Sequence, residues 1–468
     1  MLSDLQRYNP WWSDPGQFQQ DPHWRVFQNS RLRWEPALLD QVDLEQDAIY
    51  TLRGPRQVGK TTLLKQWIGR LLTRVPDPQA IFYYSCDLLS DRQELFSLLR
   101  QYQDICQPRS FPRRYIFLDE VSMLPDWQRA VKAAADLGWT DHTMILATGS
   151  SAVDLRRGAE QMPGRRGSPA KLDWLLLPMA FADFLPRTMP ELTIPEDGSL
   201  DQIREDPSAF AAWRSGWLAF AGSFQLALDQ YLKVGGFPQA VESFLQHQRV
   251  EEPIRQIYSS VVRSDIEKQR RSRNILRNLF TRTVLTEGTP QSWQGLARDA
   301  GIGSPNTALD YAEILADSFL LYILYALNRE SKTATPRKDK KLYFADPLIR
   351  DAVCGELGLP SSGVDRRVEA AVGLHLIRLY ERAPQEGLSL LQNVFYWRNS
   401  KGSEVDFVVR NGPHLIPVEV KYQEQIHAED SSLIRRSFGG GVLVTKHTCE
   451  QSGVLTLLPA ALFLLLHS

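Results

Sequence analysis

The sequence predicts an α/β protein: a doubly wound parallel sheet, followed by a helical region and a second, smaller α/β domain. Two observations support this prediction. Short apolar runs alternate with helical stretches between Ala48 and Leu185, as expected for buried parallel strands that helices connect. A glycine-rich segment ending in Gly-Lys-Thr directly follows the first of these runs, where such folds bind phosphate.

Length and composition indicate a folded protein of several domains. The chain has 468 residues, with 23% charged and 43% hydrophobic side chains, which is typical of globular proteins. Its formal net charge is −1, so any contact with nucleic acid must depend on local basic patches. The four cysteines lie far apart and form no CxxC pair, which argues against a zinc site or a disulfide framework.

The pattern along the chain predicts successive segments. Residues 1–47 form an aromatic-rich arm, 48–190 a nucleotide-binding core, 191–275 a helical lid and linker, 276–345 a winged-helix domain and 346–468 an α/β domain. The N-terminus has no basic stretch followed by an apolar one, so we expect no signal peptide. The apolar run from Val454 to Leu466 is too short to span a bilayer. We therefore expect a cytoplasmic protein without membrane contact.

The clearest motif is Gly54-Pro-Arg-Gln-Val-Gly-Lys-Thr, which fits GxxxxGK[ST] at every required position. The backbone N–H groups of such a loop surround the phosphates of ATP, next to the positive N-terminus of the following helix. Lys60 would reach the β- and γ-phosphates, and Thr61 would ligate Mg²⁺. The predicted nucleotide-binding residues are Gly54, Pro55, Arg56, Gln57, Val58, Gly59, Lys60, Thr61 and Thr62.

A second apolar strand delivers two adjacent carboxylates. Asp119 and Glu120 follow Tyr115-Ile-Phe-Leu, so they would lie at the carboxyl edge of the sheet, where α/β folds bind ligands. Asp119 would hold Mg²⁺ together with Thr61, and Glu120 would polarise the attacking water. The alternative is an acidic pair that binds Mg²⁺ in a protein without ATP turnover.

The next predicted strand supplies a candidate sensor of the γ-phosphate. Thr143-Met-Ile-Leu-Ala continues into Thr148-Gly-Ser150-Ser, which places polar side chains at the same edge of the sheet. We favour Ser150 over Thr148 as the catalytic group that contacts the γ-phosphate and positions the water. The alternative is a plain turn.

Together these elements resemble the AAA+ P-loop ATPases. More narrowly, the chain resembles bacterial and archaeal ATPases that join an AAA domain of the AAA_14 type to a C-terminal DUF4143-like region, and the resemblance spans nearly the whole chain. The supporting segments are Leu52-Arg-Gly-Pro-Arg-Gln-Val-Gly-Lys-Thr-Thr, Leu118-Asp-Glu-Val, Thr148-Gly-Ser-Ser, Gly164-Arg165, Leu177-Pro-Met-Ala-Phe-Ala-Asp-Phe-Leu and Gly235-Gly-Phe-Pro.

The resemblance implies a homo-oligomer, expected as a hexameric ring, in which an arginine of one subunit completes its neighbour's site. Such an arginine finger raises turnover by about 10³ to 10⁵. Arg165, in the segment after the sensor strand, is the candidate, and the adjacent Arg166 is the second choice. The alternative is two solvated arginines in a glycine-rich loop.

Residues 292–311 predict a helix, a glycine turn and a second helix. Ser304 fits an N-cap and Pro305 the first helical position, as in a helix-turn-helix. A basic hairpin follows, and the two together resemble a winged helix that would bind duplex or branched DNA. The hairpin carries Lys332, Arg337, Lys338, Lys340 and Lys341, and a second basic cluster carries Lys268, Arg270, Arg271 and Arg273. The alternatives are a solvated face and a protein-contact module.

The C-terminal region carries a second candidate site. Asp406 would end one strand of a hairpin, and Glu419 and Lys421 alternate along the next, so both point to one face. Glu369 on a preceding helix would add a carboxylate. Such a set can bind Mg²⁺ and activate water for phosphodiester attack, and it resembles the PD-(D/E)xK nuclease fold. The alternative is a nuclease-like fold that does not cut.

Three functions are consistent with these features. The first is a Mg²⁺-dependent AAA+ ATPase that acts as an oligomeric DNA-remodelling motor of the helicase or branch-migration type. The second is an ATP-gated DNA nuclease that uses the C-terminal carboxylates. The third is a nucleotide-switched signalling or regulatory scaffold. Because motors, loaders and switches share one ATPase core, the fold does not decide among them.

Overall fold

A five-stranded parallel sheet forms the centre of the first of two units, which comprise Met1–Leu177 and Pro178–Ser468. The computed structural model describes residues 2–109, 111–150, 162, 164–192, 198–268, 273–361, 363–381 and 388–467. The strands of the first unit are β1 (Ala48–Arg53), β2 (Ile81–Ser85), β3 (Arg114–Asp119), β4 (Thr143–Gly149) and β5 (Asp173–Leu175), in the order β2-β3-β4-β1-β5.

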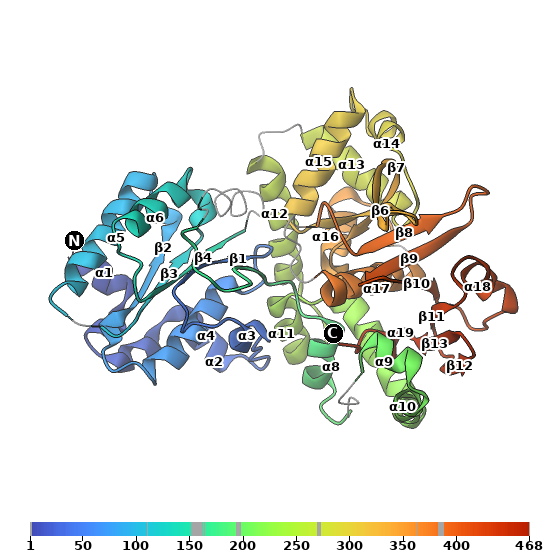
Figure 1. Ribbon diagram of the computed structural model, residues 1–468, viewed down its shortest axis with the longest axis horizontal. Coiled ribbons are helices and arrows are strands. Elements are labelled where there is room, and N and C mark those ends of the chain that lie inside the picture. Colours follow the sequence, from blue (N-terminus) through green and yellow to red (C-terminus); the bar gives the residue numbers. More distant parts are fainter. Residues whose placement is uncertain are drawn as a thin grey trace. The chain divides into compact units, whose positions relative to one another are not determined.

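Helices cover both faces of this sheet. They are α4 (Lys60–Leu72), α5 (Arg92–Cys106) and α6 (Trp127–Asp136). The chain crosses from β1 to the far edge at β2 through α4, and then returns through α5 and α6, so α4 lies on the face opposite the other two (Figure 1). Every residue of β1 and β4 is buried, which explains the continuous apolar runs in the sequence. The predicted doubly wound sheet is therefore confirmed.

The N-terminal arm closes the exposed edge of β2. Its elements are α1 (Leu2–Tyr8), η1 (Pro10–Trp12), η2 (Pro15–Gln20), α2 (Pro22–Asn29) and α3 (Leu38–Gln41). The side chain of Asn9 accepts from the N–H of Tyr83 at 2.7 Å and donates to its carbonyl at 3.0 Å. The indole N–H groups of Trp11 and Trp12 both donate to the carbonyl of Ile81. These side chains satisfy backbone groups that an edge strand would otherwise leave open.

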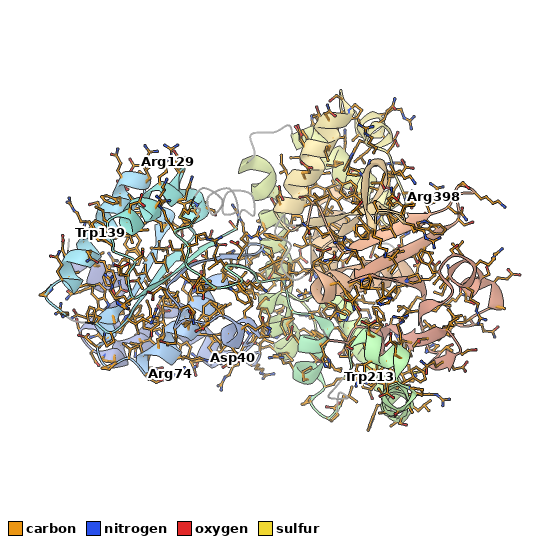
Figure 2. All side chains as sticks on the ribbon, viewed as in Figure 1. Asp40, Arg74, Arg129, Trp139, Trp213 and Arg398 are labelled. Atoms are coloured by element: carbon orange, nitrogen blue, oxygen red, sulfur yellow. The ribbon has the colours of Figure 1, made fainter. Side chains whose placement is uncertain are left out.

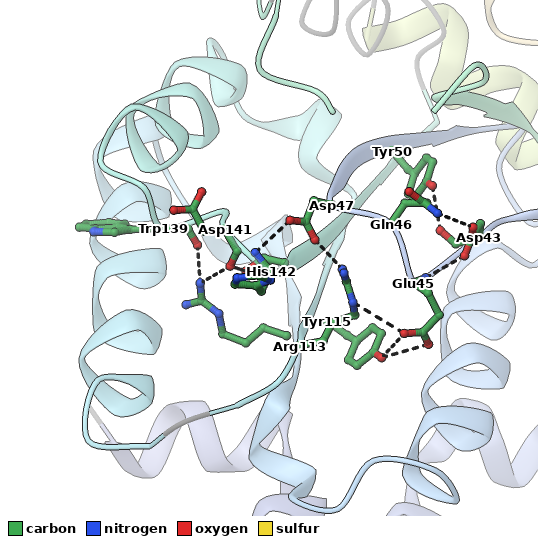
Figure 3. A network of polar contacts seen from close by, with 12 residues as sticks. Asp43, Glu45, Gln46, Asp47, Tyr50, Arg113, Tyr115, Trp139, Asp141 and His142 are labelled. Atoms are coloured by element: carbon green, nitrogen blue, oxygen red, sulfur yellow. Dashed lines mark hydrogen bonds and ion pairs between the residues drawn. The ribbon is translucent and has the colours of Figure 1, made fainter. Parts of the chain in front are cut away.

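A polar network fixes the amino-terminal edge of the sheet, opposite the phosphate-binding loop (Figure 3). Asp47, just before β1, forms an ion pair with Arg113 at 2.8 Å and accepts from the N–H of His142 at 3.1 Å. Glu45 accepts from the hydroxyl of Tyr115 at 3.1 Å. Because these residues precede or belong to β1, β3 and β4, the network holds the three central strands in register.

The second unit begins with helices and ends in a mixed sheet. Its helices are α8 (Phe181–Thr188), α9 (Leu200–Glu205), α10 (Pro207–Val234), α11 (Pro238–His247), α12 (Glu252–Lys268), α13 (Arg273–Thr286), α14 (Trp293–Asp299), α15 (Pro305–Asp317), α16 (Pro347–Leu357), α17 (Val364–Tyr380), α18 (Ser432–Phe438) and α19 (Ala460–Phe463). The Ser304 hydroxyl accepts from the N–H of Thr307 at 3.1 Å, so the predicted N-cap of the second helix in the pair is confirmed. No helix in the described ranges combines the length and apolarity needed to cross a membrane.

The sheet of the second unit includes the hairpin that the sequence assigns to a wing. Its strands are β6 (Leu321–Asn328), β7 (Thr333–Phe344), β8 (Val394–Arg398), β9 (Glu404–Asn411), β10 (His414–Lys421), β11 (Gly441–Thr445), β12 (Glu450–Ser452) and β13 (Leu455–Pro459), ordered β12-β13-β11-β10-β9-β8-β6-β7. Residues 321–327 of β6 are all buried, unlike a wing with one solvated face. The sheet joins β6 and β7 to strands β8 to β13, so it continues across the boundary at 345/346 that the sequence predicts.

Two lysines of the expected basic wing are buried in this arrangement. Lys341 is 0% exposed, and Lys340 is 3% exposed with its ammonium 4.5 Å from the ring centre of Trp293. Arg337 and Lys338 stay exposed because residues 336–339 bulge out between two paired stretches of β7. Of the second basic cluster, Arg270 and Arg271 lie outside the described residues. The basic surface of the hairpin is thus smaller than the sequence suggests, because Lys340 and Lys341 are buried.

A buried ion pair provides a test of packing in the second unit. Arg350 Nε lies 2.7 Å from Glu287 Oε2, and both side chains are at most 2% exposed. Arg350→Met would leave the carboxylate unpaired, so we expect the free energy of unfolding of this unit to fall by about 3–5 kcal/mol. Arg298→Met is the control, since Arg298 is 80% exposed and Asp299 keeps a second partner, Arg282, so the loss should be less than about 1 kcal/mol. Equal losses in urea unfolding of the two variants would contradict this account.

Candidate functional site

The phosphate-binding loop connects β1 to α4. Steric constraints explain why two of its positions are glycines. A Cβ on Gly54 would lie 2.3 Å from the carbonyl oxygen of Leu176, so no other residue fits there without backbone movement. Gly59, the N-cap of α4, has φ of +100°, which favours glycine. Lys60 and Thr61 then begin α4 and place their side chains at its positive N-terminus.

Lys60 directs its ammonium into the loop. Its Nζ donates to the carbonyls of Gly54 and Pro55, both at 3.1 Å, and lies 3.6 Å from Glu120 Oε1. The side chain is only 4% exposed. A buried positive charge beside a helix N-terminus is an arrangement that attracts phosphate.

Asp119 accepts hydrogen bonds from hydroxyl groups of three neighbouring segments. The Thr61 hydroxyl donates to Oδ2 at 2.6 Å, and the Tyr83 hydroxyl donates to the same oxygen at 3.2 Å. The Thr148 hydroxyl donates to Oδ1. Asp119 is 2% exposed, so these bonds offset the loss of hydration of its carboxylate. The structure thus brings together Thr61 and Asp119, the two predicted ligands of Mg²⁺, and their oxygens are the type that this ion prefers.

Glu120 occupies a conformation that few residues other than glycine adopt. Its φ is +52° and its ψ is +36°, in the left-handed region, and its N–H donates to the Thr148 hydroxyl at 3.1 Å. Such strain is common at functional sites. The side chain points toward Lys60 and is 24% exposed, so water can reach its carboxylate.

The structure brings Thr148, and not Ser150, into this cluster. Ala147 pairs with Leu118, so Thr148 on β4 comes next to Asp119 on β3. Its hydroxyl contacts both Asp119 and the backbone of Glu120. Ser150 lies just beyond the end of β4, and the hydroxyl groups that bond to Asp119 and Glu120 in the described residues are those of Thr61, Tyr83 and Thr148.

The two candidate finger arginines differ in their surroundings. Arg166 is 11% exposed and donates to both carboxylate oxygens of Asp173, at 3.0 and 2.8 Å, as well as to the Ile49 carbonyl. Arg165 is 37% exposed and pairs with Asp136, a half-exposed residue on the surface of α6. Arg166 therefore braces β5 against β1, while Arg165 faces solvent.

The C-terminal carboxylates also meet, but a lysine lies among them. Lys341 on β7 is 0% exposed, and its Nζ lies 3.2 Å from Glu404, 3.3 Å from Asp406 and 3.6 Å from Glu369. On β10, Lys421 pairs with Glu419 at 2.8 Å, and Glu419 also accepts from the backbone N–H of Asp406 on β9. The sequence predicts Glu369, Asp406, Glu419 and Lys421 for this site, but it assigns Lys341 to the basic hairpin and gives no role to Glu404. Lys341 stands in a basic run, which gave no signal of its burial.

Burial shifts the protonation of this C-terminal cluster. Burial, and then the nearby charge of Asp406, raises the pKa of Glu369 to about 7 and that of Glu419 to about 8. The pKa of Lys341 is also raised, because the attraction of Asp406, Glu369 and Glu404 exceeds the effect of burial. Within the described residues, no group of three or more His, Cys, Asp or Glu side chains is arranged to hold a metal ion. Lys341 and Lys421 balance part of the negative charge of this cluster, and the raised pKa values favour the protonated forms of Glu369 and Glu419.

Comparison with protein families separates three regions of the chain. Residues 46–185 match the family model of an AAA domain. The first unit has an AAA-type ATPase fold. Residues 225–362 match a domain of unknown function, DUF8612, and residues 366–461 match another, DUF4143. The resemblance to the AAA_14 and DUF4143 families is confirmed, and DUF8612 covers the region that the sequence analysis assigned partly to a winged helix.

The chain is also similar to individual proteins of other organisms. An uncharacterized protein of Methanocaldococcus jannaschii is 22% identical over 324 residues, which cover 68% of this chain and 65% of that protein. An uncharacterized protein of Haemophilus influenzae is 22% identical over 430 residues, or 88% of this chain and 92% of that protein. Among solved structures, a Walker-type ATPase of Pyrococcus abyssi is 15% identical and covers 65% of this chain and 90% of its own, with a TM-score of 0.40.

The cluster around Asp119 predicts unequal roles for Thr148 and Ser150. Thr148→Val keeps the shape but removes the hydroxyl that contacts Asp119 and Glu120, so we expect the ATPase rate to fall at least about 10-fold. Ser150→Ala is the control and should stay within about 2-fold of wild type, because the hydroxyl on β4 that bonds to Asp119 and to the N–H of Glu120 is that of Thr148. Steady-state ATPase assays distinguish the two, and a larger loss in Ser150→Ala would reverse the assignment.

The C-terminal cluster predicts that stability falls as pH rises. Between the unfolded carboxyl pKa near 4.5 and the folded values of about 7 and about 8, the native state binds protons that the unfolded state has released. The free energy of unfolding of this unit should therefore decrease from about pH 5 to about pH 8. Glu419→Gln should reduce this change of the free energy of unfolding with pH. Glu429→Gln is the control and should not, because Glu429 is exposed. An unchanged slope in Glu419→Gln would contradict the raised pKa.

Proposed function

We propose that the AAA domain hydrolyses ATP with Mg²⁺, and the observation that most supports this is the cluster joining Thr61, Asp119 and Glu120. When bound, Mg²⁺ would be held by Thr61 and Asp119, and it would neutralise charge on the β- and γ-phosphates. Lys60 would bind the same phosphates. Glu120 would orient a water and accept its proton as the water oxygen bonds to the γ-phosphorus and the bond to ADP breaks.

We propose further that Arg165 acts in the site of a neighbouring subunit, within a hexameric ring. Its side chain is 37% exposed and its partner Asp136 is 47% exposed, so the guanidinium lies at the surface, where another chain can reach it. Arg166, in contrast, is held by two hydrogen bonds to Asp173 and would have to abandon β5 to reach a neighbour. A guanidinium beside the γ-phosphate would stabilise the charge that builds up during transfer.

For the target of hydrolysis, we propose DNA, bound at one end of the C-terminal sheet. Exposed cations gather there: Arg337, Lys338, Arg398 and Lys401. Arg398 on β8 lies 3.8 Å from Asp339, which belongs to the bulge of β7. The end of β8 and this bulge therefore form one surface, and Arg398 is labelled in Figure 2. The helix α15 contains no lysine or arginine, so it is a poor candidate for contact with phosphates.

The buried Lys341 disfavours the ATP-gated nuclease. A Mg²⁺ ion bound by Asp406 and Glu369 would lie beside an ammonium that cannot move into solvent without breaking the sheet. We therefore propose that Glu369, Asp406, Glu419 and Lys421 join strands β7, β9 and β10 to α17, rather than cut DNA.

Site variants test the ATPase. Lys60→Ala should lose ATP binding, whereas Glu120→Gln should bind ATP and hydrolyse it at least about 100-fold more slowly. Arg165→Ala should bind ATP and lose about 10³-fold in turnover. Arg129→Ala is its control, because Arg129 is another exposed arginine in the AAA domain, paired on α6 (Figure 2). Binding of a fluorescent ATP analogue and phosphate release measure both steps, and full turnover in Glu120→Gln would refute its role.

Salt-dependent binding tests the DNA proposal. A variant with four substitutions should bind duplex DNA more weakly, and the slope of log K against log[salt] should fall by about 3 to 4 in magnitude. The substitutions are Arg337→Gln, Lys338→Gln, Arg398→Gln and Lys401→Gln. Gln at Arg435 and Arg436, exposed on α18, is the matched control. Wild-type ATPase activity should rise with duplex or four-way DNA. If no DNA changes the ATPase rate while nucleotide changes the oligomer size, the proposal of a motor is wrong and that of a regulatory scaffold is favoured.

A further inference from the structure

A chain of contacts links the N-terminal arm to the carboxylate of Asp119. Asp21, the N-cap of α2, forms an ion pair with Lys65 at 2.9 Å, and the two side chains are 11% and 2% exposed. The Lys65 ammonium lies 3.3 Å from the ring centre of Tyr83. The Tyr83 hydroxyl in turn donates to Asp119 Oδ2 at 3.2 Å. Two buried side chains, Tyr83 and Lys65, and the partly buried Asp21 therefore stand behind the predicted magnesium ligand.

Each contact in this chain has a physical effect on the next. Burial lowers the pKa of Lys65, and the carboxylate of Asp21 opposes that change and favours the charged ammonium. A cation on the face of an aromatic ring is attracted to it and draws electron density from it, which makes the phenol O–H a stronger donor. The Tyr83 hydroxyl is the donor in the hydrogen bond to Asp119, because an ionised carboxylate can only accept.

The arm also fixes the backbone of the same tyrosine. Asn9 bonds to both the N–H and the carbonyl of Tyr83. Tyr83 is thus held by its backbone from one side and by Lys65 from the other. A phenol with so little freedom can fix the orientation of the carboxylate that it contacts, since Oδ2 of Asp119 is also the oxygen bonded to Thr61.

We propose that Tyr83 is a positioning residue for Mg²⁺, with Lys65, Asp21 and Asn9 holding it in place, an inference that rests on the proposed ATPase function. The N-terminal arm is then part of the nucleotide site, through its contacts with Tyr83 and Lys65. Partners of metal ligands at this distance typically affect metal affinity by about 10- to 100-fold.

Tyr83→Phe tests this proposal because it removes only the hydroxyl. The readout is binding of a fluorescent ATP analogue at increasing Mg²⁺, with a parallel measurement in EDTA. We expect the Mg²⁺ concentration for half-maximal binding to rise about 10-fold, with unchanged affinity in EDTA. Tyr102→Phe is the control, since Tyr102 is another buried tyrosine of the same unit, stacked on Phe82, and its hydroxyl donates to the carbonyl of Gln79 and not to Asp119. That variant should behave as wild type.

A second variant and the wild type separate the possible failures. Lys65→Met should shift the Mg²⁺ dependence in the same direction as Tyr83→Phe. If wild type binds ATP in a Mg²⁺-dependent way and Tyr83→Phe has the wild-type dependence, Tyr83 does not position the ion, while the proposed function stands. If Tyr102→Phe shifts the dependence equally, the effect is one of packing and the proposal is overturned. If wild-type protein binds no ATP, the proposed function fails, and this proposal fails with it.

Discussion

The carboxylate of Asp119 is the group on which the nucleotide site depends. It lies at the end of β3, between β2 and β4, and hydroxyl groups from both neighbouring strands and from α4 donate to it. A buried carboxylate without such donors would be costly, so the position of each strand matters to the charge at the centre. The ionic network at the opposite edge of the sheet holds β1, β3 and β4 in register. Fold and site are therefore coupled through hydrogen bonds to one side chain.

The two acidic sites of the chain differ in what neutralises them. Around Asp119 the donors are hydroxyl groups. A metal ion could replace one of them as a partner of the carboxylate, or bind the carboxylate beside them. Around Asp406 the partner is Lys341, a fixed charge with no access to solvent. Carboxylates that look alike in sequence thus have different chemistry in the two units: one set is suited to a mobile cation, and the other already contains its cation.

The sequence was sufficient where function depends on local order. The strand, loop and helix around Gly54–Thr61 are contiguous, and the strand pattern predicted that Asp119 would reach the same edge of the sheet. It was insufficient where the register or pairing of strands decides which side chains meet. The place of Thr148 beside Asp119 follows from the alignment of β4 on β3, which periodicity alone does not give. Likewise, Lys341 looked like a wing residue, because nothing local indicates that β6 would pair with β8. The role of Tyr83 depends on an arm with little periodicity.

A crystal structure of the protein with a non-hydrolysable ATP analogue and Mn²⁺ would test the central claim most directly. Mn²⁺ replaces Mg²⁺ at oxygen sites and is located by its anomalous scattering. The account predicts phosphates in the loop of Gly54–Thr61 and one metal peak beside the Thr61 hydroxyl, on the side of Asp119. A nucleotide bound elsewhere, or a metal that contacts the phosphates and lies away from both Thr61 and Asp119, would contradict it.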